Sequence, residues 1–142
     1  MAEITDSFLE TYAESDALDL AGLVKRGEVS PAELVEAAII TIERLNPALN
    51  AVIHRLHEMA RASAVTVDRS ARFAGVPFLL KELGSSWTGA PNTNACSFLR
   101  DVVADFDTEV VRRMKTAGLV LVVNPTRPRM AGRSPPNQNS TA

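Results

Sequence analysis

The sequence is poor in the residues that form disulfides and most metal sites. Its 142 residues include one cysteine and two histidines. The single cysteine, Cys96, excludes an internal disulfide and is typical of a reducing compartment, so we expect a cytoplasmic protein. No motif places a histidine beside Cys96, so we expect a buried or loop thiol rather than a catalytic one. His54 and His57 have no third ligand within a motif, and we therefore expect no metal site. No phosphate-binding glycine loop is visible, and we expect no cofactor.

Long apolar runs and basic stripes are absent as well. No stretch approaches the length of a membrane span, and the first ten residues carry acids where a signal peptide would be basic, so we expect no membrane partner. Residues 1–123 hold all 17 acidic residues and 12 of the 15 basic ones, which gives that part a net charge of −5. A nucleic-acid-binding domain needs a basic stripe on its folded part, so we expect no nucleic-acid partner.

What is present is an ordinary globular composition, 46% hydrophobic and 23% charged, with room for one domain. Ser30-Pro31-Ala32-Glu33 is a capping box with proline at the first helical position. Asn46-Pro47 should end that helix at Leu45. Periodicity, caps and terminal glycines (Gly27, Gly118) predict helices over residues 17–26, 30–45, 56–69 and 107–117, with Ser15 or Asp16, Ser30 and Asp107 as N-terminal caps.

Short apolar runs between these helices predict strands over residues 51–55, 77–80 and 119–123. The last two strands flank a helix, which is the order of a strand–helix–strand crossover. The sequence therefore predicts an α/β fold. Residues 84–97 are rich in glycine, serine, proline and asparagine and should form a loop.

The apolar run Val76–Leu80 ends on a single lysine, Lys81. A strand this apolar is typical of the interior of a sheet. A lone lysine at its end either reaches solvent, which is the commoner case, or lies in a polar pocket where loss of hydration lets it act as a base. In the loop that follows, Trp87 either plugs the base of the loop, which we favour, or lines a substrate pocket.

The sequence on both sides of Lys81 favours a functional role for this lysine. The start of the amidase signature family is resembled, in order and spacing, by Phe73-Ala74-Gly75-Val76-Pro77-Phe78-Leu79-Leu80-Lys81-Glu82-Leu83-Gly84 and by the later Phe98-Leu99-Arg100-Asp101 and Asp105-Phe106-Asp107-Thr108-Glu109-Val110-Val111-Arg112-Arg113-Met114-Lys115-Thr116-Ala117-Gly118. The resemblance runs from about Ala17 to Val122 and looks most like the branch of 6-aminohexanoate cyclic-dimer hydrolases and general amidases. It implies the N-terminal portion of that family's fold, with helices packed on an incomplete mixed sheet. Ala95-Cys96 stands where Gly-Ser is expected, and Glu82 where many members carry aspartate.

The resemblance also implies a chemistry. Members hydrolyse amide C–N bonds of small-molecule substrates with a Ser–cisSer–Lys triad, in which Lys81 would be the lysine that takes a proton from the bridging serine. Both triad serines normally lie downstream in a Gly/Ser-rich loop, and no such segment occurs among these 142 residues. Ser85-Ser86 follows Lys81 but is typical of ordinary loop chemistry.

Three functional interpretations follow. The chain is a fragment of an amidase that is inactive alone, a non-catalytic interaction module or half of a split amidase, or a small complete enzyme that uses Lys81 with Ser85 or Ser86. The absence of a nameable oxyanion loop argues against the third. We expect the strands at 77–80 and 119–123 to lack the neighbours that the remainder of the family sheet would supply. Their edges and apolar faces would then be open, so we expect a marginal protein that is mostly insoluble or dye-binding.

The composition changes abruptly after Val122. Residues 124–142 contain four prolines and three arginines, no acidic residue and almost no large apolar side chain, which is typical of disorder. Shifting the frame by one base after the Val122 codon permits a Gly-Lys-Ser-Asn-Thr-Pro-Glu sequence of the kind expected in the family. We therefore expect residues 1–123 to be the folded fragment and 124–142 to be an out-of-frame tail.

Overall fold

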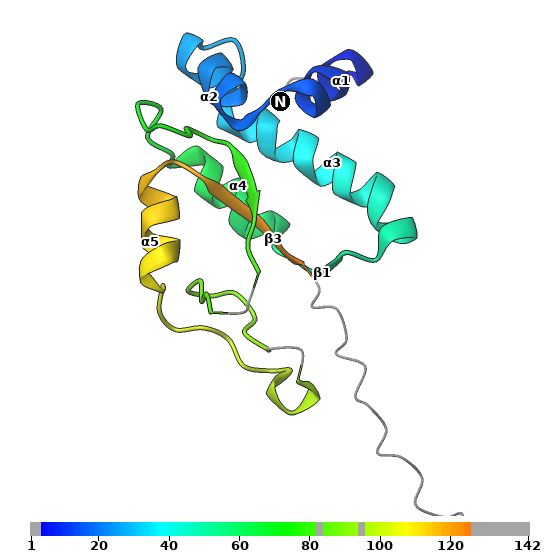
Figure 1. The fold of residues 1–142 in the computed structure, drawn as a ribbon, viewed down its shortest axis with the longest axis vertical. Helices are drawn as coiled ribbons and strands as arrows, with labels where there is room; N and C mark the ends of the chain where they lie inside the picture. Colours follow the sequence, from blue (N-terminus) through cyan, green and yellow to red (C-terminus); the bar gives the residue numbers. More distant parts are fainter. Residues whose placement is uncertain (1–3, 82–83, 94–95, 126–142) are drawn as a thin grey trace, which may run out of the picture.

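The computed structural model describes residues 4–81, 84–93 and 96–125 (Figure 1). The expected tail from residue 126 onward, and the family departures at Glu82 and Ala95, lie outside the described residues. The elements are α1 (Asp6–Glu14), α2 (Ala17–Arg26), α3 (Pro31–Leu49), β1 (Val52–Arg55), α4 (His57–Val65), β2 (Pro77–Leu79), the 3-10 turn η1 (Ser97–Leu99), α5 (Glu109–Thr116) and β3 (Val120–Pro125).

The starts of α2 and α3 are those predicted from the sequence. Asp16 accepts hydrogen bonds from the backbone N–H groups of Leu18 (2.7 Å) and Asp19 (2.9 Å). Ser30 Oγ accepts from the N–H of Glu33 at 3.2 Å, and the Glu33 carboxylate accepts from the N–H of Ser30 at 2.8 Å, which completes the capping box. Gly27 ends α2 in the left-handed conformation, as expected. The sequence reading missed α1, which is capped by the side chain of Thr5.

Helix α3 continues past Pro47, so the prediction that it ends at Leu45 was wrong. Proline removes the N–H that would pair with the carbonyl of Glu43. Both residues are exposed at this end of the helix, where water can reach that carbonyl. The helix ends at Asn50 instead, whose φ of +46° closes it through a 2.7 Å hydrogen bond from its N–H to the carbonyl of Asn46.

The other helix ends also differ from prediction. Helix α4 ends at Val65 rather than Arg69, where β-branched residues follow one another. Asp107 does not cap α5, because its carboxylate accepts hydrogen bonds from the N–H of Thr88 (2.8 Å) and from Lys115 (2.5 Å). Thr108 occupies the cap position, and Gly118, with a φ of +91°, follows the helix as expected.

The three strands form a mixed sheet in the order β1-β3-β2. β3 pairs antiparallel with β1 and parallel with β2. The expectation that β3 has an open edge was therefore wrong: it is the central strand of the described sheet, and its backbone extends to Pro125. β2, expected in a sheet interior, pairs only with β3 among the described residues, and Leu79 is 48% exposed.

Alternating residues of β3 join two cores on opposite faces of the sheet. Val120 and Val122 pack against buried residues of α3 and α4. Leu121 packs on the other side with Trp87 and with Val111 of α5. A third cluster joins α2 to α3 and to the turn before β2. Helices α3 and α4 thus lie on one side of the sheet and α5 on the other (Figure 1), which is the α/β arrangement that the sequence predicts.

Candidate functional site

Lys81 emerges at the carboxyl end of the parallel pair β2 and β3. Leu79 lies opposite Val123 in the register of β2 and β3. On the far side of β3, Val52 lies opposite Pro125, so the start of β1 is at this same end of the sheet. In open α/β sheets, ligands bind outside the carboxyl ends of the strands. The sheet topology therefore places Lys81 and the α3–β1 connection at the end where a ligand site is expected.

The side chain of Lys81 is exposed. Its backbone carbonyl accepts a hydrogen bond from Ser85 Oγ. Within the described residues, the ammonium group has neither a hydrogen bond nor an ion pair. The sequence left open whether Lys81 reaches solvent or lies in a polar pocket. Among the described residues, it reaches solvent.

Ser85 and Ser86 are held in local structure. The Ser85 hydroxyl donates to the Lys81 carbonyl, so its proton is directed at the backbone. Ser86 is buried, and its Oγ accepts a hydrogen bond from Asn92 Nδ2 at 3.0 Å. The Ser86 carbonyl accepts from the N–H of Thr108 at 3.0 Å, which ties the loop to the start of α5. These contacts are those of loop residues, and none directs a serine hydroxyl at the Lys81 ammonium.

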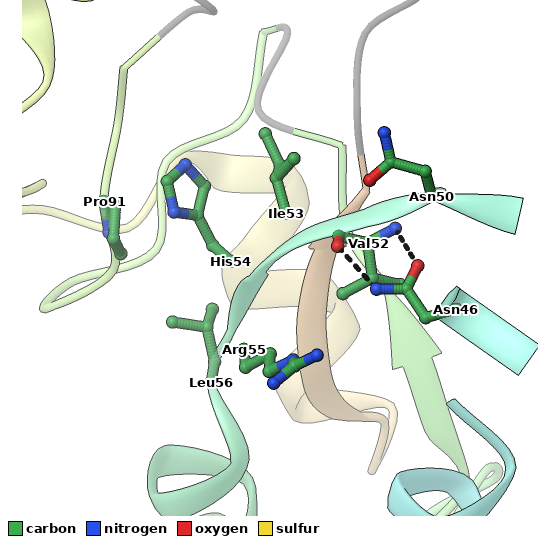
Figure 2. Close-up of a pocket in the computed structure, with 8 residues that line it drawn as sticks. All are labelled: Asn46, Asn50, Val52, Ile53, His54, Arg55, Leu56 and Pro91. Carbon is green, nitrogen blue, oxygen red and sulfur yellow. Dashed lines mark hydrogen bonds between the residues drawn. The ribbon is translucent and has the colours of Figure 1, made fainter. Parts of the chain in front are cut away.

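A shallow pocket of about 480 Å³ lies at the start of β1. Its lining combines amide, imidazole, guanidinium and apolar side chains from the end of α3, from β1 and from the loop after β2: Asn46, Asn50, Val52, Ile53, His54, Arg55, Leu56 and Pro91. Figure 2 shows Asn46 and Val52 facing each other at one end and Pro91 beyond His54 at the other. Lys81 is not one of the described residues that line this pocket.

Asn46 fixes one wall of this pocket. Its Nδ2 donates to the carbonyl of Val52 at 2.9 Å, and its Oδ1 accepts from the N–H of Val52 at 2.8 Å (Figure 2). The amide thus pairs with both backbone groups of one residue, as a neighbouring strand would. The sequence indicated Asn46 only as part of a helix end and did not single out Asn50, because a contact between a side chain and a later strand leaves no periodic signal.

A group of charges between α3, β1 and α4 borders the pocket. Arg55 Nε lies 3.3 Å from Glu43 Oε1, and Arg61 Nε lies 2.6 Å from Glu36 Oε1. The hydrogen bonds from Arg61 lower the pKa of Glu36. Burial lowers the pKa of His57, although the nearby Glu43 opposes it. His57 Nε2 is buried, has no hydrogen-bond partner among the described residues and lies 3.9 Å from Glu43 Oε1.

The remaining candidates from the sequence have structural roles. Trp87 is buried in the cluster around Leu121, as expected of a side chain that closes the base of the loop, and it also lines a second pocket of about 480 Å³ with Lys115 and Leu119. Cys96 is an exposed loop thiol. In the part of the chain that the structure describes, no group of three or more His, Cys, Asp or Glu side chains could hold a metal ion. No helix described there is both long and apolar enough to cross a bilayer.

Known proteins resemble this chain over most of its length. The family model described as Amidase matches residues 33–134, which includes part of the segment that the sequence analysis assigned to the tail. A lipoamidase from Enterococcus faecalis is 39% identical over 87% of this chain. A 6-aminohexanoate-cyclic-dimer hydrolase from Paenarthrobacter ureafaciens is 40% identical over 83% of it.

Solved structures match the fold as well. The structure of a 6-aminohexanoate cyclic dimer hydrolase superposes with a TM-score of 0.76 over 82% of this chain at 40% identity. A bacterial aryl acylamidase of the amidase signature family gives a TM-score of 0.73 at 30% identity. The chain spans about 24% of the cyclic-dimer hydrolase and 17% of the lipoamidase. The family model matches more than half of the residues, and the relatives agree with it. The chain therefore belongs to the amidase signature family and spans part of the length of these relatives.

Proposed function

We propose that this chain is the N-terminal part of an amide hydrolase and that Lys81 is the lysine of its Ser–cisSer–Lys triad. The observation that carries the proposal is the emergence of Lys81 at the carboxyl end of β2, at the end of the sheet where ligands bind, in a chain that belongs to an amidase family.

The proposed role of Lys81 is proton transfer. As a neutral amine it takes the proton of the bridging serine, which takes the proton of the nucleophilic serine. The nucleophile then attacks the amide carbonyl, and the amine leaves with a proton returned through the same path. Water hydrolyses the acyl-enzyme in the second half of the reaction. Both serines belong to the part of the family that lies downstream of the residues described here, and no cofactor is required.

The proposal has a direct test. Residues 1–125 replace the matching segment of the Paenarthrobacter ureafaciens hydrolase, and the chimera is assayed on 6-aminohexanoate cyclic dimer. Lys81→Ala should lower kcat by at least about a thousandfold, since triad residues act as a unit, with an unchanged melting temperature. Lys25→Ala, which removes an exposed lysine from α2, should leave kcat unchanged. A folded chimera that keeps its turnover after Lys81→Ala would contradict the proposal.

The origin of the short chain is a separate proposal. A missing base after the Val122 codon accounts for the change in composition, and residues 124–142 are then an out-of-frame tail. The alternative is a split amidase, in which a second gene encodes the remainder. The nucleotide sequence distinguishes them: the frameshift requires a Gly/Ser-rich segment in the shifted frame, and stops in every frame shortly after the Ala142 codon exclude it. A cytoplasmic location stays a prediction from the single cysteine.

A further inference from the structure

An arm of the chain extends between β2 and α5. Its described residues are 88–93 and 96–106, and it is built as two segments that run antiparallel. The N–H of Gly89 donates to the carbonyl of Ala104 at 2.8 Å, the N–H of Ala104 to that of Ala90 at 2.9 Å, and the N–H of Asn92 to that of Val102 at 2.9 Å. Figure 1 shows this arm in yellow-green, reaching away from the helices and the sheet.

The arm is packed at its base and at Thr93, which is 7% exposed. Ala90 belongs to the core cluster around Trp87 and Leu121, and Ala104 is 7% exposed. Farther out, Phe98 is 91% exposed, and Val102 and Val103 are 43% and 56% exposed. Neighbouring residues of an extended segment point to opposite sides. Because both valines are exposed, both faces of the arm are open to solvent.

Such an arm does not hold its shape by its own packing. An isolated two-stranded hairpin is marginal in water, and apolar side chains gathered in one exposed segment mark an interaction surface. Phe106, which follows Ala104 at the base of the arm on the α5 side, is 57% exposed as well. Exposed aromatic side chains on the same segment as exposed valines are the composition of an interface anchor.

We infer that Phe98, Val102, Val103 and Phe106 dock against the remaining part of the amidase domain, which this chain does not contain. This inference rests on the proposed function. The relatives carry this fold within chains about four times as long: the matched region is 24% of the cyclic-dimer hydrolase, with a TM-score of 0.76. The arm lies within the matched segment. In the relatives, this segment is therefore followed or preceded by the other three quarters of the chain. The occupant is that remainder, rather than a second copy of this chain.

Cys96 reports on the arm, because it is exposed, precedes Phe98 by two positions and is the single cysteine of the chain. In the chimera described above, the rate at which a maleimide labels Cys96 is followed by peptide mass. Each rate is divided by the rate in urea, which removes intrinsic differences. We expect no protection in the isolated chain and at least tenfold protection in the chimera.

Substitutions test the apolar anchor itself. Phe98→Lys should lower the melting temperature of the chimera and leave that of the isolated chain unchanged. Val65→Lys, which puts the same charge on an 82% exposed position of α4, should lower neither. If the chimera does not fold, the tagged chain is co-expressed with the remainder of the hydrolase, and the two should co-purify unless Phe98 is replaced.

Three results would overturn the inference: equal labelling of Cys96 in the folded chimera and the isolated chain, concentration-dependent protection in the isolated chain, which indicates a second copy, or no co-purification. Labelling does not require turnover. An active chimera with an unprotected Cys96 therefore refutes the docking and leaves the proposed function standing. An inactive chimera with a protected Cys96 supports the docking and contradicts the proposed function.

Discussion

The backbone N–H of Gly75 donates a 2.9 Å hydrogen bond to the carbonyl of Gly118. Gly75 lies in the turn that enters β2, and Gly118 lies in the turn between α5 and β3. Together with the 2.9 Å bond from the N–H of Val120 to the carbonyl of Val76, this contact fixes how β2 starts against β3. The strand register, and with it the position at which Lys81 emerges, follows from that start.

Gly118→Ala should therefore destabilise the chain strongly. The φ of Gly118 is +91°, and a Cβ there would lie 2.8 Å from Ala71 Cβ and 3.0 Å from the backbone of Ala74. Backbone strain and the clash together should lower the free energy of unfolding by about 3 kcal/mol, measured by urea denaturation. Gly27→Ala is the control, since its φ is +74° and nothing lies within 4 Å of the added Cβ. It should cost about 1 kcal/mol, and equal losses at the two sites would refute the clash.

Asn46→Asp should weaken the start of β1. The carboxylate keeps the acceptor for the N–H of Val52 but loses the donor to its carbonyl. An unpaired, part-buried carbonyl beside a new negative charge should cost about 1–2 kcal/mol in the free energy of unfolding. Asn50→Asp adds the same charge at an exposed residue whose positive φ aspartate tolerates, and it should cost less than half as much. Similar losses would mean that charge, rather than the amide pairing, matters here.

Stability should fall as the pH is lowered from 7.5 to 4. The pKa of His57 is lowered in the fold, mainly by burial, so the folded protein favours the neutral imidazole. The stability that this provides is complete above a pH of about 6.5 and is lost as the pH falls below that value. The pKa of Glu36 is lowered mainly by its hydrogen bond from Arg61, so its contribution is complete above about 4.5 and is lost at lower pH.

Two variants separate these contributions. His57→Gln should flatten the dependence of the unfolding free energy on pH between about 7 and 5.5, and Glu36→Gln should flatten only the part below about 5. Chemical denaturation at half-unit intervals of pH provides the measurement. A steeper fall in His57→Gln than in the parent would show that the protonated imidazole, facing Glu43, is the form that the fold prefers.

Trp87→Ala should unfold much of the isolated chain. Trp87 is 6% exposed and packs with Leu56, Leu80 and Leu121. Truncation of a buried tryptophan costs about 3–5 kcal/mol. Phe98→Ala is the matched aromatic control, because at 91% exposure its removal should change the free energy of unfolding by less than about 0.5 kcal/mol. Circular dichroism during thermal unfolding compares the two.

The isolated chain should not hydrolyse simple acyl amides above the rate in buffer. Neither Ser85 nor Ser86 directs its hydroxyl at Lys81 in the described structure, and loss of a triad nucleophile removes most of the rate enhancement. Lys81→Ala should leave the melting temperature of this chain unchanged, since the ammonium has no described partner. Turnover that disappears in Lys81→Ala would instead revive a small enzyme that uses Ser85 or Ser86.

The sequence predicted correctly those helix ends whose hydrogen bonds join residues close together in the chain. The caps at Asp16 and Ser30 form within three residues, so they could be read directly. Asp107 looked like a cap as well, but distant partners, Thr88 and Lys115, engage its carboxylate. The amide of Asn46 pairs with Val52 across a helix end, which no periodicity signals. The position of Lys81 at the carboxyl end of β2 was predictable, whereas the central place of β3 depended on pairing with β1 about seventy residues earlier.

The strand order also constrains how the protein is made. β3 is the last strand along the described chain, yet it lies between the two that precede it. During synthesis, β1 and β2 leave the ribosome with nothing to pair with, while α2 and α3 can already form on their local caps. The sheet forms only when β3 has been synthesised, and the long stretch of chain between β1 and β3, which contains α4, β2 and α5, makes that step slow. In the interval both strands are exposed edges that a chaperone can recognise or another nascent chain can capture.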